Sequence, residues 1–207
     1  MSDKPETPAP EPGDLVPCMS GEELELLDRH IPFGGNVLEF GCGGSSPHFL
    51  SRGARLLTSV ESDKAWLETL IQSPLLRHFF LKHRWVPIHA DIGPTRSWGR
   101  PSSREALLSW LEYHALSWAA MPDTAYDLIL IDGRFRVACF CQSLLRCGNA
   151  GVTIVIHDFW NRPNYHAVLE FSDVLDRAGT SVALRAKAGL DWKRLCLVLQ
   201  EHQFNPE

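Results

Sequence analysis

Short apolar segments alternate along the chain with longer segments whose apolar residues have helical spacing. Five of the short segments are nearly continuous in apolar residues and end in polar residues, which is typical of buried strands. They are residues 36–40, 55–61, 85–89, 126–131 and 152–156. The segments with helical spacing predict helices near residues 20–31, 47–52, 64–82, 102–119, 135–147 and 163–178.

Two of the predicted helices begin with the spacing of a capping box, in which a serine precedes a glutamate by three positions. These pairs are Ser20 with Glu23 and Ser102 with Glu105. The segment before the first helix, residues 1–17, is rich in proline and acidic residues. It has too little apolar surface to order itself, so we expect a flexible tail there.

The alternation of strands and helices predicts βαβ units, which form a parallel sheet covered on both faces. Two further apolar segments, residues 181–186 and 192–201, have only a short connection, which predicts an antiparallel hairpin. The expected fold class is α/β: a doubly wound, mostly parallel seven-stranded sheet with helices on both faces and a C-terminal antiparallel hairpin. We expect residues 18–207 to form this single domain, because the sequence shows no internal repeat.

Composition narrows the functional classes. The hydrophobic fraction of 44%, the charged fraction of 22% and the net charge of −5 fit a globular protein without the basic face of a nucleic-acid-binding protein. No apolar segment approaches the roughly 20 residues that cross a bilayer, and the polar N-terminus lacks the apolar core of a secretory signal. The six cysteines show no C-x-x-C pair. We therefore expect reduced thiols and a cytoplasmic protein with no nucleic-acid or membrane partner.

The first predicted strand ends in a glycine-rich turn, Gly41-Cys42-Gly43-Gly44-Ser45-Ser46, and a helix follows it. Glycine permits positive φ angles and lets a ligand approach the backbone, because it has no Cβ atom. The free N–H groups and the dipole at the start of the helix favour a ligand with a negative group. The turn therefore indicates a site for a nucleotide-type cofactor.

Acidic residues end each of the five predicted strands. In open α/β sheets, ligands bind beyond the carboxyl ends of the strands, at the switch in strand order. A single acid there is often only a helix N-cap, but five on one edge favour a shared site. These residues are Glu39, Glu61, Asp91, Asp132 and the pair His157-Asp158.

Glu61 lies twenty residues after Gly41, at the end of the second predicted strand. An acid there can accept hydrogen bonds from both ribose hydroxyls of an adenosine, which NAD and S-adenosylmethionine share. The dinucleotide fingerprint has a third glycine where this chain has Ser46. Glu39, inside the first strand end, would repel a diphosphate but not a sulfonium or ammonium group. These two residues disfavour a nucleotide-binding oxidoreductase.

An ordered set of motifs over most of the chain resembles the class I S-adenosylmethionine-dependent methyltransferases. The family's first motif, an apolar strand, an acid and G-x-G-x-G, is similar to residues 37–45, with Ser45 in place of the last glycine. The second acid matches Glu61, the third motif Asp91-Ile92, and the fourth motif residues 126–132. The family also has a seven-stranded sheet that ends in an antiparallel strand pair.

The resemblance implies methyl transfer from S-adenosylmethionine to the oxygen or nitrogen of a small-molecule acceptor. Such a transfer needs the nucleophile held in line, ~3 Å from the methyl carbon. The residues implied at the cofactor are Glu39, Gly41, Gly43, Gly44, Ser45, Glu61, Ser62, Asp91, Ile92 and Asp132. The candidate catalytic residues, which could remove a proton from the acceptor, are His157, Asp158 and Asp132.

A divalent metal is an alternative that we do not favour. Some O-methyltransferases of this class bind one with acids after the fourth and fifth strands and a nearby asparagine. Asp132, Asp158 and Asn161 could supply oxygen ligands of the kind Mg²⁺ prefers. The spacing of Asp158 and Asn161 differs from the adjacent Asp-Asn pair common in those enzymes.

The acceptor side offers further candidates. Three arginines near the same edge could pair with a carboxylate or phosphate, or could be solvated surface charges: Arg134, Arg136 and Arg162. Tryptophans in the segment 93–120 could contact the acceptor, or could be core or oligomer contacts: Trp98, Trp110 and Trp118. A homo-oligomer is possible. The alternative function is a non-catalytic methyltransferase-like protein that binds the cofactor, which the departure at Ser45 motivates.

Overall fold

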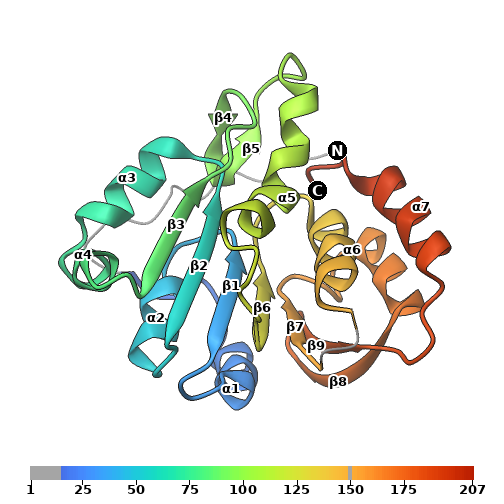
Figure 1. The fold of residues 1–207 in the computed structure, drawn as a ribbon, viewed down its shortest axis with the longest axis horizontal. Helices are drawn as coiled ribbons and strands as arrows, with labels where there is room; N and C mark the ends of the chain where they lie inside the picture. Colours follow the sequence, from blue (N-terminus) through green and yellow to red (C-terminus); the bar gives the residue numbers. More distant parts are fainter. Residues whose placement is uncertain (1–14, 149–150) are drawn as a thin grey trace.

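The computed structural model describes residues 15–148 and 151–207 of the 207-residue chain. A seven-stranded sheet with the order β3-β2-β1-β6-β7-β9-β8 forms its centre (Figure 1). The first five strands in that order are parallel, and β9 runs antiparallel to both β7 and β8. The strands are β1 (Asn36–Phe40), β2 (Leu56–Glu61), β3 (Trp85–His89), β6 (Leu128–Ile131), β7 (Thr153–Ile156), β8 (Ser172–Ala178) and β9 (Ser181–Ala186). The predicted fold class is confirmed.

Helices cover both faces of the sheet. One face packs against α1 (Gly21–His30), α2 (Ser45–Ser51), α3 (Lys64–Gln72) and α4 (Pro74–Leu81). The other packs against α5 (Trp110–Ala120), α6 (Arg136–Cys147), the 3-10 helix η3 (Pro163–Glu170) and α7 (Trp192–His202). Short elements complete the described chain: η1 (Ser97–Gly99), η2 (Leu107–Ser109) and a separate two-stranded sheet of β4 (Thr95–Arg96) and β5 (Arg100–Pro101). No helix of the described ranges combines the length and apolar character that a bilayer span requires.

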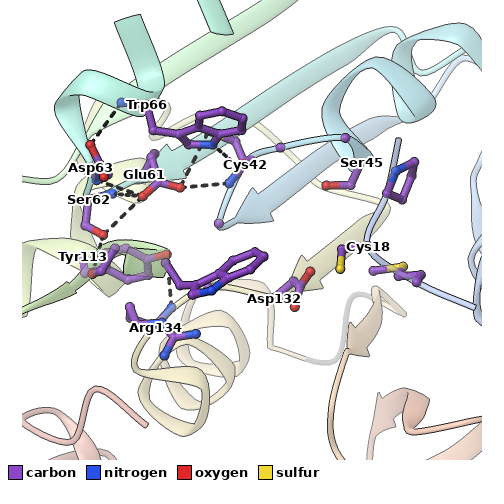
Figure 2. Close-up of a pocket in the computed structure, with 18 of the residues that line it drawn as sticks. Cys18, Cys42, Ser45, Glu61, Ser62, Asp63, Trp66, Tyr113, Asp132 and Arg134 are labelled. Atoms are coloured by element: carbon purple, nitrogen blue, oxygen red, sulfur yellow. Dashed lines mark hydrogen bonds between the residues drawn. The ribbon is translucent and has the colours of Figure 1, made fainter. Parts of the chain in front are cut away.

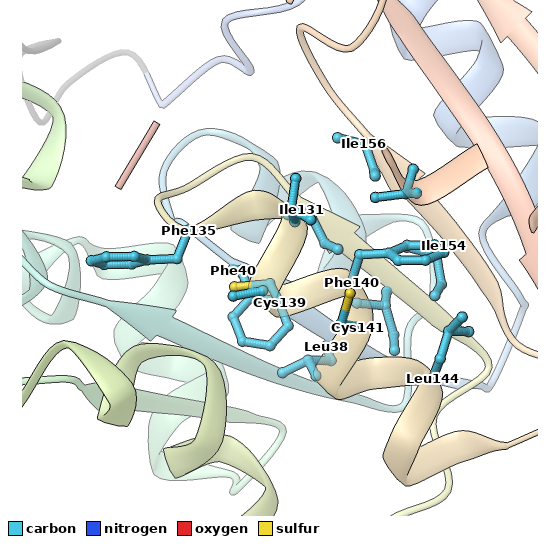
Figure 3. Close-up of a cluster of buried hydrophobic side chains, with 14 of the residues drawn as sticks. Leu38, Phe40, Ile131, Phe135, Cys139, Phe140, Cys141, Leu144, Ile154 and Ile156 are labelled. Atoms are coloured by element: carbon cyan, nitrogen blue, oxygen red, sulfur yellow. The ribbon is translucent and has the colours of Figure 1, made fainter. Parts of the chain in front are cut away.

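Side chains of each central strand divide between two apolar clusters, because successive residues of a strand point to opposite faces. In β1, Val37 belongs to the cluster under α1 to α4, whereas Leu38 belongs to the cluster under α5 to α7. Figure 3 shows the latter cluster, where Cys139 and Phe140 of α6 lie among strand residues such as Ile154. These buried contacts hold the helices on the two faces of the sheet. The carboxyl ends of the strands therefore have fixed positions relative to one another.

The C-terminal hairpin lies earlier in the chain than the sequence pattern predicts. It consists of β8 and β9, so the prediction of a helix over residues 163–178 was wrong beyond Glu170. Only the 3-10 helix η3 occupies the first part of that range. Gly179 has a φ of 52° between the two strands, a conformation that glycine adopts without strain and that permits the tight reversal.

The prediction of a strand over residues 192–201 was also wrong, because these residues form α7. Asp191 caps this helix by accepting a hydrogen bond from the backbone N–H of Arg194. Leu195 and Val198, three positions apart and fully buried, face the rest of the cluster around α6. The helical spacing of the apolar residues and the N-cap therefore decide the structure of this segment, although its high apolar content favoured a strand.

The predicted helix over residues 64–82 is two helices. Pro74 lies in the first turn of α4, where its missing N–H costs no hydrogen bond, while α3 ends before Ser73. The capping box of Ser20 and Glu23 at the start of α1 is confirmed, because both reciprocal hydrogen bonds are present.

The second predicted capping box does not form. The Ser102 hydroxyl donates to the carbonyl of Pro94, and the N–H of Glu105 donates to Ser103 instead. The α-helix of this region consequently begins only at Trp110. Of the residues predicted to be helical before it, 102–106 belong to no helix or strand and 107–109 form η2. The preceding β4 and β5 lie at the carboxyl edge of the main sheet (Figure 1).

Candidate functional site

A cavity lies beyond the carboxyl ends of β1, β2 and β6, beside the point where the strand order reverses (Figure 2). Segments far apart in the sequence contribute to it. The lining consists of residues 16–19, 41–45, 61–63 and 132–134, together with Trp66, Trp98, Gly99 and Tyr113. Both acidic and aromatic side chains therefore face one concave space.

The cavity brings together most of the residues that the sequence places at a cofactor. Those that line it are Gly41, Gly43, Gly44, Ser45, Glu61, Ser62 and Asp132. The other five predicted site residues lie outside its lining: Glu39, Asp91, Ile92, His157 and Asp158. Their positions relative to the cavity differ, and each is described below.

The glycine turn approaches its neighbours too closely for larger residues. Gly41 has a φ of 88°, and a Cβ atom there would lie 2.6 Å from the Cα of Gly133. A Cβ on Gly44 would lie 2.1 Å from the backbone of Val16. Gly43 has no atom within 4 Å of the corresponding position, so this part of the turn is open to a ligand.

Glu39 is fully buried behind the turn. Its carboxylate accepts hydrogen bonds from the hydroxyls of Ser45, Ser46 at 2.7 Å and Ser59 at 2.8 Å. Burial raises the pKa of Glu39 to about 7, although the three hydroxyls oppose that shift. Because Ser45 also lines the cavity, it connects this carboxyl group to the ligand space.

Glu61 ends β2 and lines the cavity directly. Its Oε1 accepts hydrogen bonds from the backbone N–H groups of Ser62 at 2.7 Å and Asp63 at 2.9 Å. The N–H of Cys42 approaches the other oxygen, Oε2, at 3.3 Å. Burial raises the pKa of Glu61, while these donors favour the ionised form. Oε2, with a single long backbone contact, is the oxygen best placed to accept further hydroxyl donors.

Two contacts hold together the end of the cavity where Glu61 lies. Trp66, positioned by the Asp63 N-cap of α3, donates its indole N–H to the carbonyl of Cys42 at 2.9 Å. The Ser62 hydroxyl donates to the carbonyl of Gly99 at 3.0 Å, so the β4–β5 segment lies over the end of β2. Next to it, Trp98 has a φ of 63° and remains 46% exposed.

Asp91 and Ile92 follow β3 and are not part of the cavity lining. Asp91 is exposed and accepts the N–H of Gly93, closing a local turn. Ile92 is buried in the core, and its carbonyl accepts the indole N–H of Trp110 at 3.1 Å. Trp98 and Gly99 line the cavity instead, and the assignment of Asp91 and Ile92 to the cofactor stays a prediction.

Asp132 follows β6 and connects the cavity to His157, which is half-buried. Its Oδ1 lies 2.8 Å from Nδ1 of His157 and 3.2 Å from Nη2 of Arg136. On its far side, His157 Nε2 lies 3.7 Å from Glu23 of α1. Burial alone would lower the pKa of His157, but Asp132 raises it above the ordinary value. The imidazole therefore lies behind Asp132, one residue removed from the cavity.

Asp158 lies away from the cavity in an ion-pair network. Its Oδ2 is 2.9 Å from Arg162 and 3.8 Å from Arg136. Arg136 thus lies between Asp132 and Asp158, where a divalent ion would have to bind, and Asn161 contacts only the Oδ1 of Asp158. Within the described ranges, no group of three His, Cys, Asp or Glu side chains could hold a metal ion. The donor set does not fit the metal alternative.

Several cavity residues carry no role in the sequence interpretation. Trp66 could have been found, because an Asp63 N-cap places the third helical residue near the strand end. Tyr113 has no local signal, since only the packing of α5 brings its hydroxyl to the β6 turn. Val16 and Pro17 belong to the predicted tail but line the cavity, whereas residues 1–14 of that tail lie outside the described residues.

No protein-family model matches the chain, and no curated protein matches it. Among solved structures, the chain is similar to a methyltransferase-like protein from Silicibacter pomeroyi DSS-3. The sequences are 26% identical, the match covers 93% of this chain and 100% of that chain, and the TM-score is 0.75.

The chain is also similar to a ribosomal protein L11 methylase from Lactobacillus delbrueckii subsp. bulgaricus. That match has 15% identity, covers 80% of this chain and 77% of that chain, and has a TM-score of 0.51, so it concerns the fold alone. The structural neighbours are methyltransferase-like proteins, and the chain has the class I S-adenosylmethionine-dependent methyltransferase fold.

Proposed function

We propose that this protein is a cytoplasmic methyltransferase that uses S-adenosylmethionine to methylate an oxygen or nitrogen atom of a small-molecule acceptor. The observation that carries the proposal is the position of Glu61. Its buried carboxylate lines the cavity at the end of β2, next to the glycine turn after β1. A ribose with two free hydroxyls is the ligand group that such a carboxylate recognises.

The residues of the cavity fit S-adenosylmethionine better than a dinucleotide. Gly43 leaves open space over the turn, and Glu61 supplies an acceptor for the ribose. Glu39 places a titratable carboxyl group behind Ser45, which suits a cationic ligand and would oppose a diphosphate. Trp66 and Trp98 offer aromatic surface at the end where Glu61 lies.

When bound, the cofactor supplies an electrophilic methyl group, which bonds to the acceptor atom as the carbon–sulfur bond breaks and the electron pair stays on sulfur. The acceptor loses one proton in this step. Asp132 is the residue that we assign to receive it, because its contacts with His157 and Arg136 both use Oδ1, so Oδ2 can accept the proton. His157 orients Asp132, and Arg136 links both to Asp158.

The test is ligand-dependent stability of the protein with S-adenosylmethionine, S-adenosylhomocysteine or NAD. A ligand at 100 times its Kd adds about 2.7 kcal/mol to the free energy of unfolding. We expect a response to the two adenosyl ligands and none to NAD. Glu61→Ala should raise the Kd for S-adenosylhomocysteine about tenfold or more, since a charge-assisted hydrogen bond contributes about 1.5–3 kcal/mol.

The exposed Glu68 of α3 provides a matched control, because Glu68→Ala removes a carboxylate from the same region without touching the cavity. The proposal fails if only NAD stabilises the protein, or if Glu61→Ala and Glu68→Ala bind S-adenosylhomocysteine equally well.

A second candidate function is binding of the cofactor without methyl transfer. The observation that favours it is that Asp132 is already paired with His157 and Arg136. Transfer of a labelled methyl group to any small acceptor would exclude this candidate. Tight binding of S-adenosylmethionine without turnover over a broad acceptor panel would support it.

A further inference from the structure

Arg134 is a buried cation that forms no ion pair with any residue that the structure describes. The residue is 6% exposed, and its Nε and Nη1 atoms have no hydrogen-bond partner among the described residues. It nevertheless lines the cavity, next to Gly133. A guanidinium group stays charged in proteins, so its burial without an anion is costly unless something supplies one.

The surroundings of Arg134 increase this cost. Burial and the nearby charges of Arg136 and Arg100 lower the pKa of Arg134. The other arginines of the region have acidic partners: Arg136 contacts Asp132 and Asp158, while Arg100 and Arg162 both contact Glu207, at 3.2 and 3.8 Å. Arg134 is therefore the member of the cluster whose charge the described chain leaves unbalanced.

A second group next to Arg134 can also bind an anion. The hydroxyl of Tyr113 accepts the backbone N–H of Arg134 at 3.2 Å, so its own proton is available to another acceptor. A Cβ on Gly133 would lie 1.9 Å from this hydroxyl, so glycine there allows the close approach. Figure 2 shows Tyr113 and Arg134 together, across the view from Ser45 and Cys18 at the other end of the cavity.

We propose that Arg134 and Tyr113 form a binding site for an oxyanion, and that the methyl acceptor carries this group as a carboxylate or phosphate. The assignment of the anion to the acceptor rests on the proposed methyltransferase function. The anion site itself depends only on the cavity, the unpaired guanidinium and the tyrosine hydroxyl. A planar guanidinium can hold either oxyanion through two parallel hydrogen bonds.

The test observes the guanidinium itself. The Nε–H resonance of Arg134 in a ¹⁵N-labelled protein is assigned with the Arg134→Lys variant and followed during titration with acetate, with inorganic phosphate and with acetamide as the neutral analogue. We expect a saturable shift with acetate or phosphate and none with acetamide, and the tighter anion identifies the acceptor class. Exposed Arg146 of α6 is the internal control, because its resonance should show no saturable response.

Stability provides an independent measurement. Arg134→Gln removes an uncompensated buried charge, so its melting temperature should equal or exceed that of the wild type, and its affinity for S-adenosylhomocysteine should change less than about twofold. Destabilisation by Arg134→Gln together with no anion response in the wild type would overturn the proposal and make Arg134 a structural residue.

Two further outcomes separate this inference from the proposed function. If the resonance of Arg134 shifts on adding S-adenosylhomocysteine, and acetate and phosphate then cause no change, the arginine serves the cofactor carboxylate and the proposal is wrong. If acetate or phosphate binds while neither adenosyl ligand does, the anion site stands and the methyltransferase assignment fails.

Discussion

Glu39 shows how a single buried residue can couple cofactor binding to pH. Its carboxyl group is fully buried, is held by three serine hydroxyls and has a pKa raised by burial to about 7. The free protein therefore favours the protonated form more than the unfolded chain does, and the stability that this provides is lost as pH rises from about 4.5 through 7. A cationic ligand in the cavity has the opposite preference, because it attracts the ionised form.

The affinity for S-adenosylmethionine should consequently fall as pH decreases from 8 to 6, by at most about tenfold per pH unit below the pKa of Glu39. S-adenosylhomocysteine lacks the sulfonium charge, so its affinity should fall less steeply. Calorimetric titration of both ligands at several pH values measures the difference. Glu39→Gln should remove the difference and stabilise the free protein at pH 8 by about 1–3 kcal/mol; parallel pH profiles in the wild type would contradict this role.

At Asp132, the proposed reaction depends on one carboxylate oxygen. Asp132→Asn should lower kcat about 10²–10⁴-fold, because the amide cannot accept the acceptor's proton. His157→Gln should have a smaller effect on kcat and should shift its pH profile, since His157 only positions Asp132. Exposed Asp173 of β8 supplies the control, Asp173→Asn. Equal kcat values for Asp132→Asn and Asp173→Asn would exclude Asp132 as the base.

At the scale of the elements, hydrogen bonds of Glu23 connect α1 to the C-terminal hairpin. Its Oε1 accepts the N–H of Thr180 at 2.9 Å and the hydroxyl of Thr180 at 2.7 Å, in the turn between β8 and β9. Its Oε2 accepts the N–H of Ser20 at 2.8 Å. Burial opposes ionisation, yet these hydrogen bonds lower the pKa of Glu23 to about 2. The acid joins the first helix to the last hairpin.

A depressed pKa contributes stability above the unfolded value of about 4.5 and loses it as pH falls towards 2. Glu23→Gln should therefore reduce the free energy of unfolding at pH 7 by about 1–3 kcal/mol and flatten the loss of stability between pH 4.5 and 2. Denaturant unfolding at pH 7, 4 and 3 measures both effects. Glu22 lies exposed in the same helical turn, and Glu22→Gln should be within about 0.5 kcal/mol of the wild type.

The sequence pattern predicts the central strands well but fails at the C-terminal elements. Buried parallel strands are short, continuous apolar runs between polar residues, which leaves little ambiguity. In the last third of the chain, residues 172–178 form a strand at the edge of the sheet. Most of its residues face solvent, so their pattern of polar and apolar residues resembles that of a helix. Residues 192–201 contain enough apolar residues to resemble a strand, although the Asp191 cap and the spacing of Leu195 and Val198 indicate the helix.

Over the whole molecule, the cavity depends on contacts that no local pattern contains. The glycines and acids at strand ends can be predicted as site residues from the sequence, because each belongs to one strand and the turn that follows it. Tyr113, Trp98 and Val16 reach the cavity only after α5, the β4–β5 segment and the chain before α1 have packed on the sheet. Asp91 shows the converse, since it occupies the expected position in the sequence but is exposed and outside the cavity lining.

The packing of these segments around the cavity predicts which backbone amides ligand binding should protect from hydrogen exchange. S-adenosylhomocysteine should slow amide hydrogen exchange in residues 15–19 and 95–101, because both segments line or border the cavity yet lie outside the main sheet. The α7 helix has no residue in the cavity lining, so its local exchange should not change. Exchange measured by mass spectrometry with and without ligand tests this. Equal protection of α7 and the cavity segments would instead indicate global stabilisation. A Cβ atom on residue 44 would displace Val16, so Gly44→Ala should selectively abolish the protection of residues 15–19.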